Sequence, residues 1–230
     1  MRARGTNASH SVVKLRFFEG LGTRELEVIR RAAMERRYPA SSVITNQGRP
    51  ADHLYLLISG RARYFYITKS GRKTLLLWLT PGEILGSAAF LSRPSEYLMS
   101  TEAIKDSSFL VWDSAAIRGL AVRYPKLVEN ALSMGSKHLG WYLADHVALV
   151  CDTARERLAQ VLIQLAGVIG QKSPEGIEFD ATNEELASAA NITPFTASRL
   201  LTEWQTNRAV IKRRGKILLR SPEQLLQRAA

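Results

Sequence analysis

The sequence predicts an α+β protein with an N-terminal β-roll, a long helix and a C-terminal winged helix-turn-helix. Three observations predict this order. Short strand-like segments broken by turn residues lie between Tyr38 and Trp112, a helical pattern reaches about Val150, and two capped helices and a hairpin follow. A chain of 230 residues can form two modest domains. We expect a flexible tail over 1–12, a β-roll sensor domain over 13–124, a dimerisation helix over 125–151 and a winged helix-turn-helix domain over 152–230.

The composition narrows the choice of partner and compartment. With 32 Lys+Arg against 21 Asp+Glu, the formal charge of +11 suits DNA or an anionic membrane, although a solvated basic surface explains it equally well. The one cysteine, Cys151, excludes an intramolecular disulfide framework and a cluster held by four cysteines of one chain. The first residues lack the apolar core of a signal peptide, and the longest apolar runs are too short to span a bilayer. We therefore expect a cytoplasmic protein without a membrane partner.

The N-terminal half has the pattern of short helices followed by an antiparallel roll. Apolar residues from Phe17 to Ile29 have helical spacing, and Thr23 is a suitable cap. Residues rich in β-branched, aromatic and leucine side chains then predict strands at Ser42–Thr45, Leu54–Ser59, Ala62–Thr68, Thr74–Leu79 and Ser108–Trp112. Turn residues separate them, including Ser59-Gly60 between the second and third. Such a series is typical of a small barrel or roll.

A helical pattern follows Asp113, with Pro125 as the place for a break. One stripe of this pattern has the alternating steps of four and three of a coiled-coil seam, and its members are Leu127, Ala131, Met134, His138 and Trp141. We expect a parallel homodimer through this stripe. The alternative is that the stripe packs on the roll of its own chain.

The last part of the chain carries two capping boxes and a tight turn. Thr153 to Glu156 starts a new helix, a loop spans Gly170–Gly176, and Ile177–Phe179 predicts a short strand. Thr182 to Glu185 starts a second helix, which ends near Asn191, and Thr193-Pro194 starts the next one at once. Two short helices joined by a tight turn are the signature of a helix-turn-helix. Double-stranded DNA is therefore the expected partner.

The second of these helices would present its N-terminal half to base edges. Arg199 is the candidate for guanine O6 and N7, and Phe195 for a thymine methyl. Thr193, Thr196 and Ser198 are candidates for phosphate contacts. Beyond this helix, Ala209–Ile211 and Ile217–Leu219 predict a hairpin wing whose cations would meet the phosphate backbone, namely Lys212, Arg213, Arg214 and Lys216. An ordinary solvated hairpin is the alternative for the wing.

The order of elements and five segments together resemble the Crp/Fnr superfamily of bacterial transcription regulators. The segments are Asn46–Gly48, Asp52–Gly60, Pro81–Gly86, Arg157–Leu162 and Thr182–Arg199. The resemblance implies a cyclic-nucleotide-binding-like roll and a homodimer that binds an inverted repeat, with RNA polymerase as a further partner. No P-loop, paired-carboxylate site, metal-ligand spacing or nucleophile elbow points to an enzyme.

The sequence departs from the resemblance at two sites. Cyclic-nucleotide binders of the family carry a Glu after the last roll glycine and an Arg about ten residues later, whereas this chain has Ser87 and Tyr97 there. Arg93 precedes a proline in a predicted loop. We therefore expect no binding of cyclic AMP or cyclic GMP in the usual manner, because the phosphate lacks its cation. Pro194-Phe195 also replaces the family's acidic first turn, so the DNA site should differ from the common half-site.

The resemblance places any effector between the roll and the long helix. The candidate lining is aromatic and apolar, which suits a neutral or aromatic molecule: Leu85, Ser87, Tyr97, Met99, Tyr142 and Leu143. A filled core without ligand is the equal alternative. A haem or redox sensor with the same DNA output is another, but the spacing of His10, His53, His138 and His146 indicates no ligand pair. For Cys151 a buried structural thiol is favoured over a redox role. No cofactor or metal is predicted.

Overall fold

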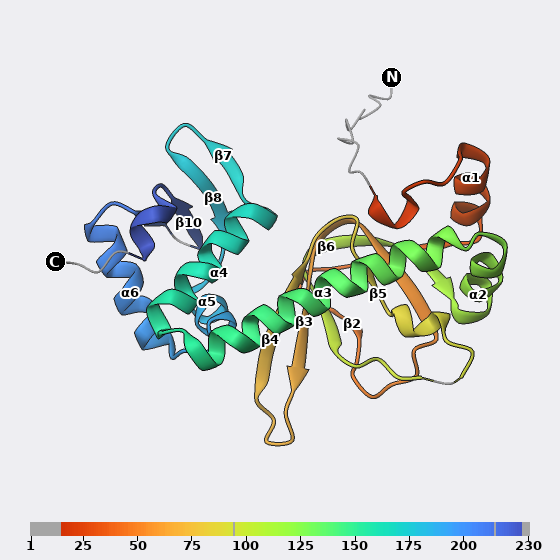
Figure 1. Cartoon of the computed structure of the whole chain (residues 1–230), viewed down its shortest axis with the longest axis horizontal. Helices are drawn as coiled ribbons and strands as arrows, with labels where there is room; N and C mark the ends of the chain where they lie inside the picture. The colour runs from red at the N-terminus through yellow and green to blue at the C-terminus, as the bar shows by residue number, and fades with distance from the viewer. Residues whose placement is uncertain (1–14, 94, 214, 227–230) are drawn as a thin grey trace, which may run out of the picture. The chain divides into compact units, whose positions relative to one another are not determined.

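The computed structural model of the chain, traced in Figure 1, describes residues 15–93, 95–213 and 215–226. The chain divides into two compact units. The first comprises the residues up to Ala62 and those from Leu79 to Gly135, and the second comprises Arg63–Trp78 and Ser136–Ala230. The tail expected over 1–12 lies outside the described residues, and so do His10 and the wing residue Arg214.

Short helices open the first unit. The 3-10 helix η1 spans Arg16–Phe18 and the helix α1 spans Thr23–Arg31. The cap of α1 is Gly22, one residue before the predicted Thr23, and the Glu25 carboxylate accepts a hydrogen bond of 2.7 Å from the Gly22 amide. A carboxylate in the first turn satisfies an amide that the helix itself leaves unpaired.

The roll is an antiparallel sheet with the order β1-β6-β3-β4, in which β2 also pairs with β6 and β5 with β3. Its strands are β1 Met34–Tyr38, β2 Val43–Thr45, β3 His53–Ile67, β4 Lys73–Leu79, β5 Ile84–Leu85 and β6 Ser100–Asp113. The 3-10 helix η2 spans Ser87–Phe90, and α2 spans Ser114–Arg123. The predicted roll is confirmed.

Three details of the predicted strands are wrong. No turn interrupts β3 at Ser59-Gly60; instead Gly60, at φ +93°, lies against the backbone of Asp106 and Ser107 on β6. A side chain at this glycine would collide with that strand, so the residue serves a close approach of two backbones. The sequence also did not indicate β1, an edge strand that carries little buried apolar surface, or the first eight residues of β6.

The core of the first unit forms around Trp112, whose indole Nε1 donates a hydrogen bond of 2.8 Å to the carbonyl of Ile29. Phe17 and Phe18 pack beside this indole. The long helix α3 spans Lys126–Cys151, and the chain breaks before it at Pro125 as predicted. Its Leu127 enters this same core, so the first turns of α3 belong to the roll.

The second unit contains the C-terminal domain together with the paired ends of β3 and β4. Its elements are α4 Ala154–Ile169, β7 Gln171–Ser173, β8 Gly176–Asp180, α5 Asn183–Ala189, α6 Pro194–Thr206, β9 Val210–Arg213, β10 Lys216–Leu219 and η3 Pro222–Leu225. The sheet order is β7-β8-β10-β9, and β7 lies in the segment predicted as a loop. Leu158, Leu162 and Trp204 are fully buried, and Trp78 of β4 packs against their cluster. Among the described residues, no helix has the length and apolarity needed to cross a membrane.

Candidate nucleic-acid interface

The turn between α5 and α6 has the predicted chemistry. Thr182 Oγ1 accepts a hydrogen bond of 3.2 Å from the Glu185 amide, and the Glu185 carboxylate accepts one of 2.9 Å from the Thr182 amide, which forms the capping box of α5. Asn191 has a φ of +49° and reverses the chain. Thr193 then caps α6, because its Oγ1 accepts from the Thr196 amide at 3.1 Å. The helix-turn-helix prediction is confirmed in its local geometry.

Two arginines of α4 hold this turn and α6 in place. Arg157 donates to the carbonyl of Ala190 at 2.9 Å and to that of Asp152 at 2.7 Å. Arg155 forms an ion pair of 2.6 Å with Glu203 of α6, and both side chains are largely buried. Charged donors on buried carbonyls and carboxylates are among the stronger polar contacts of a protein. Contacts from α4 therefore fix the position of α6 and of the turn before it.

Burial divides α6 into an inner and an outer face. The inner face consists of Ala197, Leu200, Leu201 and Trp204, all at most 3% exposed. The Trp204 Nε1 donates a hydrogen bond of 3.0 Å to the carbonyl of Leu225. Apolar contacts of this number fix the rotation of the helix about its own axis. The opposite face of α6 is consequently the one left to a partner.

The outer face contains the residues that the sequence assigned to DNA. Thr193, Phe195 and Arg199 are exposed, and the Phe195 side chain is 78% exposed. Thr196 and Ser198 are half-buried, and the hydroxyls of Thr193 and Thr196 lie 2.9 Å apart in a hydrogen bond. An apolar partner group that covers this ring would remove its surface from water, which is favourable. These residues thus form one surface at the N-terminal half of α6.

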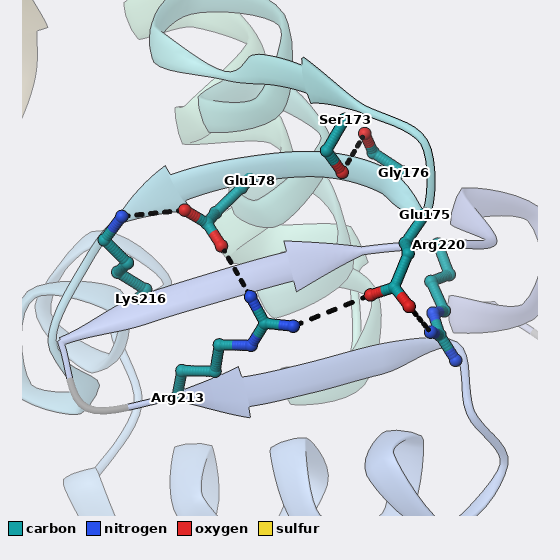
Figure 2. Close-up of polar contacts among 7 residues, drawn as sticks. All are labelled: Ser173, Glu175, Gly176, Glu178, Arg213, Lys216 and Arg220. Carbon is teal, nitrogen blue, oxygen red and sulfur yellow. Dashed lines mark hydrogen bonds and ion pairs between the residues drawn. The ribbon is translucent and has the colours of Figure 1, made fainter.

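The wing is a hairpin of β9 and β10, with Arg213 directly opposite Lys216. Both cations, however, pair with carboxylates that the sequence analysis did not include (Figure 2). Glu178 of β8 contacts Lys216 at 2.7 Å and Arg213 at 3.1 Å. Glu175 contacts Arg213 at 3.6 Å and Arg220 at 3.1 Å.

This cluster changes the expected electrostatics of the wing. The hydrogen bond from Lys216 and the positive charges of Lys216 and Arg213 hold the pKa of Glu178 below its ordinary value of 4.5. The same hydrogen bond raises the pKa of Lys216. Glu178 on β8 faces Leu218 on β10, and β10 lies between Glu178 and Arg213 on β9. The ion pairs of Glu178 therefore join segments that are distant in sequence, which sequence spacing does not reveal. A DNA phosphate at the wing would compete with a carboxylate for Arg213 and Lys216, whereas the exposed Lys212 is in no ion pair within the described residues.

The dimer seam predicted on α3 is wrong at its first three members. Leu127, Ala131 and Met134 are at most 6% exposed and belong to the core of the first unit, so a partner cannot reach them. His138 and Trp141 are half-buried, and their rings stack at 5.4 Å. The alternative given above, a stripe that packs on its own roll, holds for the beginning of the helix.

Another face of α3 leaves apolar side chains exposed. Its members are Leu132, Leu139, Leu143, Val147 and Val150, each between 57% and 75% exposed. Together with Ser136 and His146, this face also shows alternating steps of four and three, from Leu132 to Val150. We call it the exposed α3 stripe. Its members follow those of the predicted stripe by one or two residues, which places it on nearly the opposite side of the helix.

The predicted effector lining is divided between the two units. Leu85, Ser87, Tyr97 and Met99 belong to the first, and Tyr142 and Leu143 belong to the second. Tyr97 is engaged within the roll, because its hydroxyl donates to the His53 carbonyl at 3.1 Å and accepts from the His53 amide at 3.2 Å. Burial raises the pKa of the Tyr97 hydroxyl. The Tyr97 hydroxyl therefore both donates and accepts a hydrogen bond within the roll.

The second unit has a cavity of about 390 Å³ between β4, α3, α4 and the end of α5. Tyr142 lines it, and burial raises the pKa of this tyrosine to about 12. Leu143 instead belongs to the exposed α3 stripe. Cys151, expected to be buried, is exposed at the end of α3. A structural thiol in the core is thus the wrong interpretation of this cysteine.

Comparisons with known proteins agree with this architecture. The cyclic nucleotide-binding domain family matches residues 35–124, and the Crp-like helix-turn-helix domain family matches residues 156–228. A CRP-like cAMP-activated global transcriptional regulator of Mycobacterium tuberculosis is 24% identical over 93% of this chain and 95% of its own length. The cyclic AMP receptor protein of Thermus thermophilus is 28% identical over 80% of this chain and 82% of its own.

A solved structure of FixK2 from Bradyrhizobium japonicum has the same fold, with a TM-score of 0.73, 22% identity, and coverage of 86% of this chain and 98% of that one. The capped helix pair, the wing and the roll define a DNA-binding transcription regulator with an N-terminal cyclic-nucleotide-binding-like domain. The chain belongs to the Crp/Fnr superfamily.

Proposed function

We propose that the protein binds an inverted repeat as a homodimer, with α6 of each protomer in the major groove. The observation that carries this proposal is the outer face of α6, where Phe195 and Arg199 are exposed while the opposite face is locked into the core. In a recognition helix these N-terminal positions meet base edges. Two such helices related by a two-fold axis require a site with the same symmetry.

Within each half-site we assign separate roles to the exposed residues. Arg199 takes guanine O6 and N7 through its two-pronged guanidinium, and Phe195 packs on a thymine methyl. Thr193, Thr196 and Ser198 contact phosphates, as do the wing cations Lys212, Arg213, Arg214 and Lys216. Contacts of the second kind position the protein without reading sequence.

The exposed α3 stripe supports the homodimer. Leu132, Leu139, Leu143 and Val150 lie at the spacing of a coiled-coil seam, with Val147 beside it, and these apolar side chains are stabilised when a second copy covers them. The same symmetric dimer places two copies of α6 on one duplex. RNA polymerase is the further partner that we propose for the regulator bound at a promoter.

We also propose that cyclic AMP and cyclic GMP do not control the protein in the usual manner. Ser87 and Tyr97 stand where a carboxylate and a guanidinium would bind ribose and phosphate, and the Tyr97 hydroxyl is already paired with the His53 backbone. A phosphate charge needs a cation or several donors to replace its water. Calorimetry with each nucleotide should therefore give no binding at micromolar concentrations; a micromolar Kd would refute this part.

The central test is selection of duplexes from a random pool by the purified protein, followed by sequencing. The proposal predicts enrichment of one inverted repeat, with half-sites about one helical turn apart. Basicity alone would retain all sequences to the same extent. If a folded dimer enriches no sequence, the proposed function is wrong.

A further inference from the structure

A basic hairpin packs beside the helix-turn-helix in the second unit. It is formed by residues Arg63–Trp78, the paired ends of β3 and β4, and we call it the basic hairpin. It contains Arg63, Lys69, Arg72 and Lys73 and no Asp or Glu. Four positive charges and no acid within 16 residues give this segment a formal charge of +4.

Three polar contacts fasten this hairpin along α5. Arg63 Nη1 lies 3.0 Å from Glu185 Oε1, in an ion pair whose side chains are only 24% and 21% exposed. The Leu75 amide donates to Ser188 Oγ at 3.3 Å. Near the tip, Arg72 Nη2 donates to Asn191 Oδ1 at 3.5 Å. The hairpin therefore follows α5 from its first turn to the residue that reverses the chain.

The tip of the hairpin is held in one shape by its own hydrogen bonds. The Arg72 amide donates to Thr68 Oγ1 at 3.1 Å, and the same hydroxyl lies 2.9 Å from that of Ser70. Gly71 takes a φ of +78°, which a tight turn of this kind requires. Lys69 and Arg72 are exposed on this turn. Cations on an ordered turn lose less conformational freedom on binding than cations on a loose loop.

The contact at Asn191 places these cations beside the DNA-reading helix. Asn191 precedes Thr193, the cap of α6, by two residues, a span of at most about 7 Å. The base edges read by α6 are flanked by phosphates of the same groove. Arg72 contacts Asn191, which precedes the cap of α6, and Lys69 is exposed on the same turn as Arg72, so the tip carries the charge that these phosphates need.

We propose that the tip of the basic hairpin, through Lys69 and Arg72, binds the DNA backbone beside each half-site as a second phosphate-binding element in addition to the wing. The site is sequence-independent, and it extends the footprint on the side of the α5–α6 turn. This proposal rests on the DNA-binding role given above.

The test uses the full-length dimer, the selected duplex and the variant Lys69→Gln/Arg72→Gln. The dissociation constant is measured by fluorescence anisotropy over a series of salt concentrations. Each lost phosphate contact makes the log–log salt slope shallower by about 0.9, so loss of both contacts in each protomer makes it shallower by about 3.6 per dimer. The preference among half-site sequences should stay unchanged, because backbone contacts carry no sequence information.

The matched control is Arg24→Gln/Arg30→Gln, which removes two exposed cations of α1 in the other unit. It should leave the slope as in the wild type. A second measurement uses a duplex with neutral methylphosphonates beside the half-sites. This duplex should bind the wild type more weakly than the unmodified one, whereas the affinity of the hairpin variant should stay almost the same. If the double variant does not fold, Lys69→Gln alone takes its place.

Two outcomes would overturn the proposal: an unchanged slope in the hairpin variant, or an equal change in the α1 control. In both cases the wild type still selects its inverted repeat, so the proposed function stands. Failure of the wild type to select any sequence refutes the proposed function instead. The two failures are thus distinguishable.

Discussion

Truncation of Leu143 to alanine should weaken the homodimer without unfolding the protomer. Leu143 is 58% exposed in the middle of the exposed α3 stripe. Full burial of a leucine side chain contributes about 1.5–3 kcal/mol, so covering the exposed fraction contributes about 1–2 kcal/mol. Both protomers lose this contribution, and the dimer loses about 2–4 kcal/mol, which raises its dissociation constant roughly 30- to 1000-fold.

Sedimentation velocity over a series of protein concentrations measures this dissociation constant directly. The comparison variant is Leu127→Ala, at a position fully buried in the core of the first unit. This change should lower the free energy of unfolding by about 2–5 kcal/mol, because it leaves a cavity. It should leave the dimer constant of the folded protein nearly unchanged.

The reasoning is refuted if the two variants exchange behaviours. A dimer weakened by Leu127→Ala at unchanged protomer stability would restore the seam first predicted from the sequence. A Leu143→Ala variant that dimerises like the wild type would show that no partner helix covers the exposed α3 stripe.

Four further predictions concern DNA binding, the wing and the helix-turn-helix. Arg199→Ala should relax the preference at one base pair per half-site, at a cost of about 1–3 kcal/mol; a uniform loss over a library of sites would contradict its role in base readout. Glu178→Gln should tighten DNA binding about two- to fivefold at low salt, because it frees Lys216 for phosphate. No change would mean that the wing does not contact DNA. The pKa of Glu178 is lowered in the folded protein, so the ionised carboxylate stabilises the fold at pH values above 4.5, and this stabilisation is lost as the pH falls through the folded pKa. A pKa of 4.5 or higher for Glu178 in an NMR titration would contradict its ion pairs with Lys216 and Arg213. Arg63→Ala and Glu185→Ala should each destabilise the protein by about 1–3 kcal/mol, and the double variant should lose less than the sum of the two. Strictly additive losses in thermal unfolding would mean that the ion pair does not contribute.

Local chemistry made the DNA-binding end of the chain predictable. The capping box of α5, the positive φ at Asn191 and the Thr193 cap all depend on residues within a few positions of one another. Interactions between residues three or four positions apart can be read directly from the sequence. The exposed Phe195 and Arg199 then follow from helical periodicity and the buried positions of Leu200 and Trp204.

Features that depend on contacts between distant segments were not predictable in this way. The heptad spacing on α3 exists in two stripes on nearly opposite sides of the helix, and only the packing of Leu127 into the roll decides which of them stays exposed. Gly60 has the sequence context of a turn, yet the approach of β6 makes it part of a continuous strand. Glu178 meets Lys216 only after β8 and β10 pair.

The sequence by itself determined the class of the fold, the positions of the helix-turn-helix and wing, and the residues on the exposed face of α6, since these depend on periodicity and on local hydrogen bonds. Tertiary structure decided which face of α3 stays open, which wing cations are already paired, and which segment lies beside the α5–α6 turn. These depend on long-range packing, where one buried leucine or one pairing register decides between patterns that the sequence permits equally.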